Sequence, residues 1–289
     1  MTSTLLNLSG KIDHLTISVL RRVQQVARIE RIPFFIVGAT ARDILLEAAH
    51  EIAHKRATID IDLAVFLQDW DQFDRIKNAL IENAEFEPAR EIHRLIFQGR
   101  LPVDIVPYGS IAGSNKQIKW PPDQSIRMSV VGFEECYQNS IPIQLADSPE
   151  LVARVVSLAG LAILKLISWD DSTERRRKDA SDLCCIIQNY LDAGNLERLF
   201  VDAPDIVETD DYEHEHASAR LLGRDMANIA YRETKAALTK ILEEESIRAS
   251  GHRIAMDALQ NDGLNALTYE RMVAYFDLLL KGLTEENSP

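Results

Sequence analysis

Two aspartates separated by one residue, Asp60 and Asp62, are the first feature of this sequence that could do chemistry. They lie in the apolar run 58–63, and residues two apart in a β-strand point to the same face of a sheet. The two carboxylates would then stand side by side while the apolar residues of the run enter the core. Aspartate is unfavourable in strands, and neighbouring carboxylates disfavour each other's ionisation, so the pair predicts a divalent-metal site.

A third carboxylate, Asp104, occurs in the apolar run 101–106. The apolar residues of this run would face the core, so Asp104 would point to the other face, as the aspartate pair does. Three carboxylates on one face of neighbouring strands can hold two Mg²⁺ ions, or Mn²⁺. In phosphoryl-transfer enzymes two such ions lie ~3.5–4 Å apart and stabilise the attacking and leaving oxygens. We therefore expect Asp60, Asp62 and Asp104 to be metal ligands.

Gly38 follows the apolar run 34–37 and precedes a helical stretch. A glycine at such a turn lets a phosphate approach the backbone N–H groups at the helix N-terminus. The structural alternative is a tight turn in which Thr40 caps the helix. Both readings stay open for this turn.

Two charged residues fall within apolar helical patterns further along the chain. Lys165 lies in 155–169, which is apolar on nearly every side, so its ammonium must snorkel, pair or meet a ligand. Asp179 lies at the centre of the apolar stripe of 175–190 and also needs a partner. It could pair with Lys165, orient it, or hold a ribose. Asp182 lies at the edge of the same stripe, where a surface position and a functional role are equally compatible with the pattern.

The elements that must position these residues follow from apolar periodicity. The expected strands cover 34–37, 58–63, 91–98, 101–106 and 125–131, with expected helices at 15–29, 41–49 and 70–84. Gly99 and Arg100 should join two of these strands in a hairpin. From Ser148 onward helical periodicity covers 149–169, 175–190, 217–230, 233–245 and 269–280. We predict an α+β fold, with a mixed sheet flanked by helices (residues 1–146) followed by an all-helical C-terminal domain (147–289).

The composition narrows the class of protein. The 289 residues are 46% hydrophobic, and no apolar run reaches the ~18 residues of a membrane span, so we expect a cytoplasmic globular protein. A net charge of -13 argues against a surface that binds nucleic acid everywhere. The dense positive run 175–178 is the exception, either as a local patch for RNA or as a solvated helix start.

The motifs taken together resemble a known family. Gly38, the Asp60-x-Asp62 pair and the later Asp104 resemble the DNA polymerase beta-like nucleotidyltransferase superfamily. More narrowly, the chain resembles the AbiEii/AbiGii toxin-type nucleotidyltransferases over about residues 30–190, in the segments 37–43, 56–62, 165–169 and 178–183. The resemblance implies a nucleotidyltransferase-type sheet, and transfer of a nucleoside monophosphate from an NTP to a hydroxyl with release of pyrophosphate.

The resemblance also implies roles for single residues. Asp60 and Asp62 would ligate the metals, and Asp104 would also help to activate the acceptor hydroxyl. The implied catalytic residues are Asp60, Asp62, Asp104, Lys165 and Asp179. The implied nucleotide-binding residues are Gly38, Ala39, Thr40, Arg42, Arg56, Lys165 and Asp182, with Lys165 on the triphosphate.

For Arg42, Arg56 and Arg94, which lie beside the motifs, an ordinary ion pair is the competing interpretation. The superfamily usually has Gly-Gly or Gly-Ser at the turn; Ala39 keeps the backbone N–H but lacks the serine hydroxyl.

Toxin-type relatives imply RNA, notably tRNA ends, as the acceptor, and a cognate antitoxin as a protein partner. In this interpretation the helical domain closes the nucleotide cleft and presents an acceptor surface. Two alternatives stay open: a small-molecule nucleotidyltransferase of the antibiotic-modifying type, and a catalytically silent NTP-binding module.

Overall fold

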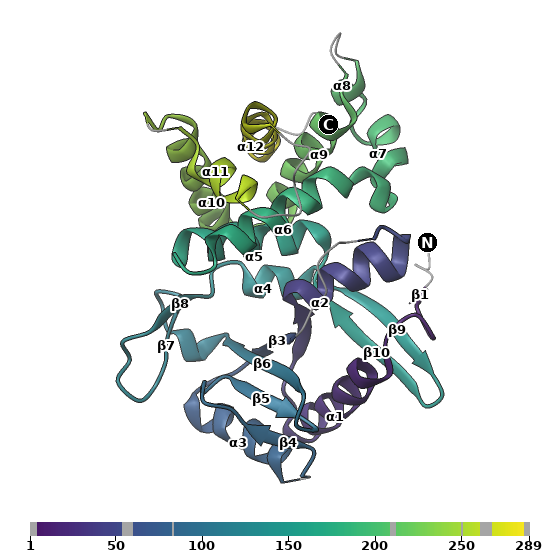
Figure 1. Ribbon diagram of the computed structural model, residues 1–289, viewed down its shortest axis with the longest axis vertical. Coiled ribbons are helices and arrows are strands. Elements are labelled where there is room, and N and C mark those ends of the chain that lie inside the picture. The colour runs from purple at the N-terminus through teal and green to yellow at the C-terminus, as the bar shows by residue number, and fades with distance from the viewer. Residues whose placement is uncertain are drawn as a thin grey trace. The chain divides into compact units, whose positions relative to one another are not determined.

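The computed structural model describes residues 5–53, 60–82, 84–208, 212–249, 251–260 and 268–285. The chain divides into two units. The first unit contains Met1–Ala49 and Ala57–Ser157, and the second contains His50–Arg56 and Leu158–Pro289. The first is built on a sheet and the second on helices (Figure 1).

An eight-stranded mixed sheet forms the centre of the first unit, with the strand order β1-β9-β10-β2-β3-β6-β5-β4 (Figure 1). In that order the strands are Leu6–Asn7, Ile141–Asp147, Glu150–Val155, Phe34–Val37, Ile61–Phe66, Leu101–Tyr108, Arg94–Phe97 and Phe86–Pro88. The central strand β3 is antiparallel to β2 and parallel to β6, and β5 is antiparallel to β6. A separate two-stranded sheet pairs β7 (Gln117–Lys119) with β8 (Arg127–Ser129).

Two long helices of this unit, α1 (His14–Glu30) and α3 (Trp70–Ile81), pack against each other (Figure 1). Each begins at an aspartate whose carboxylate accepts a backbone N–H of the first turn, Asp13 for α1 and Asp69 for α3. Each buries one apolar stripe, which closes the core against the sheet.

The remaining helices of the first unit are short. They are α2 (Gly38–Asp43), the π-helical turn η1 (Ile44–Ala48), the 3₁₀ turn η2 (Ser110–Ala112) and α4 (Phe133–Gln138). Because α2 starts directly at the end of β2, the glycine turn lies beside the neighbouring strand β3.

The second unit consists of helices within its described residues. They are α5 (Leu158–Asp171), α6 (Arg176–Asn189), η3 (Leu191–Asn195), α7 (Leu196–Val201), α8 (Pro204–Val207), α9 (His214–Ile229), α10 (Arg232–Ser246), α11 (Arg253–Leu259) and α12 (Tyr269–Thr284). Helices α9 and α12 cross closely: a Cβ at Gly282 would lie 2.0 Å from the Arg220 carbonyl oxygen, and one at Gly223 would lie 2.3 Å from that of Leu279. Glycine is needed at both positions because any larger residue would separate the helices.

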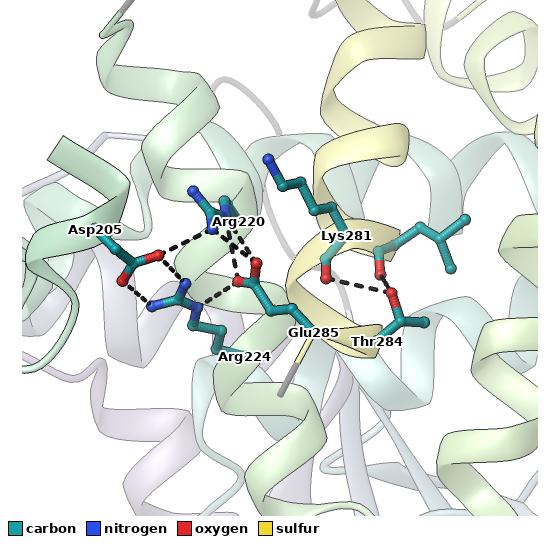
Figure 2. Close-up of polar contacts among 7 residues, drawn as sticks. Asp205, Arg220, Arg224, Lys281, Thr284 and Glu285 are labelled. Carbon is teal, nitrogen blue, oxygen red and sulfur yellow. Dashed lines mark hydrogen bonds and ion pairs between the residues drawn. The ribbon is translucent and has the colours of Figure 1, made fainter. Parts of the chain in front are cut away.

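A cluster of two arginines and two carboxylates ties the end of α12 to α8 and α9 (Figure 2). Arg220 on α9 donates to Glu285 at 2.8 Å and to Asp205 at 2.9 Å. Arg224, one turn later, donates to both carboxylates as well. Burial raises the pKa of Glu285, but the hydrogen bonds from the two arginines outweigh it, so the net pKa is lowered. The Arg224 hydrogen bond lowers the pKa of Asp205.

The predicted fold class, a mixed sheet flanked by helices and followed by a helical C-terminal region, is confirmed. The hairpin around Gly99 is also confirmed, with Phe97 paired to Leu101. The predicted helix over 149–169 is wrong in its first third, because Glu150–Val155 is strand β10 and the helix begins at Leu158. In β10, alternate residues are buried and β9 supplies the ladder partners, so this segment has the period of a strand.

No described helix is both long enough and apolar enough to cross a lipid bilayer.

Candidate functional site

Strand register places three charged residues in one row across the sheet. Asp62 on β3 is the ladder partner of Asp104 on the parallel strand β6, and Asp104 is in turn the partner of Arg94 on β5. Directly paired residues project to the same face, so the three side chains lie next to one another. On the other side of β3, Asp62 pairs with Val37, the last residue before the glycine turn.

The predicted carboxylates come together. Asp60, one residue before β3, joins Asp62 and Asp104, and each offers an oxygen within 4.8 Å of those of the others. Asp60 and Asp62 are half-buried and Asp104 is buried. A set made only of carboxylate oxygens fits the hard cations Mg²⁺ and Mn²⁺. These residues could therefore hold a divalent metal.

The glycine turn fits tightly against this group. Gly38 has a φ of +66°, and a Cβ on it would lie 1.9 Å from Oδ2 of Asp62. Thr40, two residues later, donates its hydroxyl to the Asp60 carbonyl oxygen at 2.9 Å. The turn and the aspartate strand are thus fixed to each other at two points. The Thr40 hydroxyl is engaged with the protein, so it positions Asp60, while the nucleotide contact expected of Thr40 stays a prediction.

Arg94 forms a parallel fork with Asp104. Its Nε donates to Oδ1 at 2.6 Å and its Nη2 to Oδ2 at 2.7 Å, and Nη2 also reaches Oδ2 of Asp60 at 3.2 Å. The Asp104 hydrogen bond is the main cause of the raised pKa of Arg94, so the guanidinium stays charged.

The pairing of Arg94 with Asp104 differs by one residue from the register that the sequence predicts. A two-residue turn at Gly99 and Arg100 would place Arg94 opposite Ile105, whereas the structure has a three-residue turn, 98–100, which pairs Phe97 with Leu101 and Arg94 with Asp104. The segment before Arg94 is anchored by Lys77, which donates to the Ile92 carbonyl oxygen. Burial lowers the pKa of Lys77.

The other nucleotide-binding residues predicted near the glycine turn lie in different environments. Ala39 and Thr40 are buried in the first turn of α2. Arg42 is 1% exposed and its guanidinium donates to Asp43 at 2.7 Å, which is a structural ion pair. Arg56 lies outside the described residues.

A second cluster lies within the helical unit. Lys165 on α5 lies 2.9 Å from Oδ1 of Asp179 and 2.6 Å from Oδ2 of Asp182, both on α6. Ser168 donates to the other oxygen of Asp179 at 2.7 Å. Burial by itself lowers the pKa of Lys165, but the two carboxylates outweigh it and raise the pKa above its ordinary value. Lys165 is therefore paired rather than snorkelling, and Asp182 faces inward.

Comparison with solved structures finds distant likenesses. A crystal structure of ANT(2'')-Ia in complex with adenylyl-2''-tobramycin has 14% identity and a TM-score of 0.35, covering 65% of this chain and 94% of that one. A CCA-adding enzyme in apo form I has 12% identity and a TM-score of 0.33, covering 94% and 81%. The Thermotoga maritima CCA-adding enzyme complexed with tRNA has 12% identity and a TM-score of 0.27, covering 96% and 82%. No curated protein matches the chain.

The family comparison covers most of the sequence. Residues 23–262 match the model described as nucleotidyl transferase AbiEii toxin, type IV toxin–antitoxin system. The matched range contains the carboxylate group on β3 and β6, the glycine turn and the Lys165 cluster. The chain belongs to the AbiEii family of nucleotidyltransferases.

Proposed function

We propose that this protein transfers a nucleoside monophosphate from an NTP to a hydroxyl of an RNA acceptor, with tRNA as the expected class, and acts as the toxin of a toxin–antitoxin pair. The observation that carries the chemistry is the group of three carboxylates within 4.8 Å, set against a glycine turn at the start of a helix. Family membership supports the same reaction type.

The bond changes are those of an in-line displacement. The acceptor oxygen forms a bond to the α-phosphorus, the bond from that phosphorus to the bridging oxygen breaks, and pyrophosphate leaves. The proton of the attacking hydroxyl passes to a carboxylate oxygen, for which we propose Asp104. Asp60, Asp62 and Asp104 would hold the divalent metal, which when bound offsets the charge that develops on the phosphate oxygens.

The glycine turn has a separate task in this proposal. The backbone N–H groups of Gly38 and Ala39 begin α2, where the helix dipole favours anionic groups. We propose that they bind phosphate oxygens of the NTP. Thr40 keeps this turn in place through its bond to the Asp60 carbonyl, so a shift of the turn would also move the metal-ligating strand.

In the helical unit, we propose that Lys165 supplies the cation for the triphosphate. Asp179 and Asp182 hold the Lys165 ammonium in one place and keep it charged. A compact ammonium with three donors suits this task.

The acceptor can be identified by labelling. Purified protein is incubated with each α-labelled NTP, Mg²⁺ or Mn²⁺ and total RNA, and the RNA is separated by size. We expect label in the tRNA fraction, and its loss when periodate has oxidised the terminal ribose. If RNA is still labelled after periodate has oxidised its terminal ribose, the acceptor is an internal hydroxyl of the RNA. No label in RNA, together with labelled small molecules, would favour the antibiotic-modifying alternative, and no incorporation anywhere would favour the silent module.

A further inference from the structure

The guanidinium of Arg94 adjoins the carboxylate group, and nothing in the proposed reaction uses it so far. We propose that Arg94 is a built-in counter-charge that holds Asp104 in position and limits the affinity of this site for a divalent metal. The inference rests on the proposed function, since it concerns the same metal site.

The first argument is the geometry of the hydrogen bonds between Arg94 and Asp104. Both oxygens of Asp104 accept from Arg94, at 2.6 and 2.7 Å. Each carboxylate oxygen has two acceptor positions, and the fork uses one on each, so Arg94 does not occupy the second position of either oxygen. Asp104 can therefore contact a metal or a hydroxyl while its plane is fixed by the arginine. Arg94 is a positioning residue for Asp104.

The second argument is the effect of the Arg94 charge on a bound cation. Three carboxylates carry at most three negative charges, and the guanidinium offsets one of them; His93, whose Nε2 lies 4.0 Å from Oδ2 of Asp104, is a further basic side chain beside the group. Arg94 also contacts Asp60 at 3.2 Å, so its charge acts on both β3 and β6. A cation bound to the same carboxylates would be repelled by the guanidinium at close range. Removing Arg94 should thus tighten metal binding even though it loosens Asp104.

Opposite effects on metal binding and on turnover distinguish this role from a purely structural one. An arginine that only stabilised the hairpin would, when removed, weaken both properties or leave both unchanged. The charge and the fork can also be separated, because lysine keeps the charge but lacks arginine's planar donor pair.

The test is Mn²⁺ titration of the nucleotide-free protein by calorimetry, alongside the rate of nucleotidyl transfer. We expect Arg94→Gln to bind Mn²⁺ about tenfold more tightly than the wild type, since one nearby unit charge is removed. Its transfer rate should fall at least tenfold. Arg94→Lys should bind Mn²⁺ within about threefold of the wild type and also transfer slowly. Arg100→Gln, an exposed residue of the same hairpin with the same change in net charge, is the matched control and should leave both values unchanged.

An Arg94→Gln protein with Mn²⁺ affinity equal to or weaker than the wild type would overturn the inference. If that variant does not fold, Arg94→Lys decides, because more than a tenfold loss of Mn²⁺ affinity with the charge retained would contradict it. The variant Asp62→Asn distinguishes a wrong role for Arg94 from a wrong assignment of the metal centre. If Asp62→Asn binds Mn²⁺ with the wild-type affinity, the proposed metal centre itself is wrong. If Asp62→Asn binds Mn²⁺ more weakly while Arg94→Gln keeps the wild-type affinity, only the proposed role of Arg94 is wrong.

Discussion

At the scale of single residues, the site depends on a close fit between a glycine and an aspartate. Gly38 has a positive φ, and any Cβ there would overlap the Asp62 carboxylate. The Thr40 hydroxyl donates to the backbone carbonyl of Asp60, the residue just before strand β3. The glycine therefore serves two needs at once: the turn conformation and the space for the Asp62 carboxylate.

Gly38→Ala should displace Asp62 and reduce transfer by roughly two orders of magnitude, the usual effect of a ~1 Å misplacement in an active site. Gly99→Ala is a matched control, because Gly99 has a φ of +67° but nothing within 4 Å of the added Cβ. The control loses some stability through backbone strain and keeps its activity. Steady-state transfer rates and Mn²⁺ titration measure the difference; equal rates for the two variants would contradict this account of the turn.

At the scale of elements, helices α5 and α6 are joined by a buried ion triad. Lys165 is the cation, and Asp179 and Asp182 lie one turn apart on α6 with their carboxylates toward it. Removing one partner of a buried pair leaves an uncompensated charge, whereas removing all charges need not be costly.

Lys165→Met should therefore lower the free energy of unfolding by about 3–5 kcal/mol. The triple variant Lys165→Met/Asp179→Asn/Asp182→Asn should regain most of this loss, since no buried charge is left unpaired. Urea unfolding followed by circular dichroism measures both proteins. A triple variant that is no more stable than Lys165→Met would show that the triad is not the source of the effect.

The sequence predicted the convergence of the carboxylates because strand periodicity and one hairpin suffice for it. Asp60, Asp62 and Asp104 all lie in or beside apolar runs whose alternation sets the exposed face. The pairing of Arg94 with Asp104 was not predicted, because it depends on a three-residue turn at 98–100, and the expected two-residue turn shifts the strand register by one residue.

Other features could not be read from local pattern. Strand β10 has the two-residue burial period of a strand, but the almost wholly apolar helix α5 begins three residues after it, so the apolar positions of 149–169 can also be fitted to one long helix. The inward position of Asp182 depends on which face of α6 meets α5. These are properties of packing between elements, which a single sequence does not specify.

At the scale of the whole molecule, positive and negative charges are unevenly distributed. The net charge is -13, yet the run 175–178 at the start of α6 is basic, with Arg175 and Arg177 exposed. At the other end of the chain, the arginine–carboxylate cluster around Glu285 holds the end of α12 (Figure 2).

Glu285→Gln should lower the unfolding free energy at neutral pH by about 1–3 kcal/mol, because charge-assisted hydrogen bonds from Arg220 and Arg224 are lost. The pKa of Glu285 is lowered by folding, so its contribution is fully present above its ordinary value of about 4.5 and is lost as the pH falls through the lower folded pKa. The difference in Tm between the two proteins should thus narrow in acid. Glu244→Gln, which breaks an exposed pair with Lys240, is the control and should show little difference at any pH. A Glu285→Gln difference that stays constant down to acid pH would oppose this view of the cluster.

If RNA is the acceptor, its affinity should fall steeply with salt, because phosphate contacts release counterions. Arg175→Ala/Arg177→Ala should reduce the slope of log K against log salt by about 2. The control Arg232→Ala/Lys240→Ala removes two exposed cations from α10 and should leave the slope unchanged. Filter binding of labelled tRNA over a salt series gives these slopes; equal slopes for the two double variants would exclude the 175–178 run as the RNA contact.

The central claim is that the carboxylates on β3 and β6 catalyse metal-dependent nucleotidyl transfer. The most direct measurement is the rate of incorporation of α-labelled NMP into RNA by the wild type and by Asp62→Asn, with Asp71→Asn on the exposed side of α3 as the matched control. We predict transfer by the wild type and Asp71→Asn that requires Mg²⁺ or Mn²⁺ and stops with chelator, and none by folded Asp62→Asn. Metal-dependent transfer by Asp62→Asn at the wild-type rate would contradict the account.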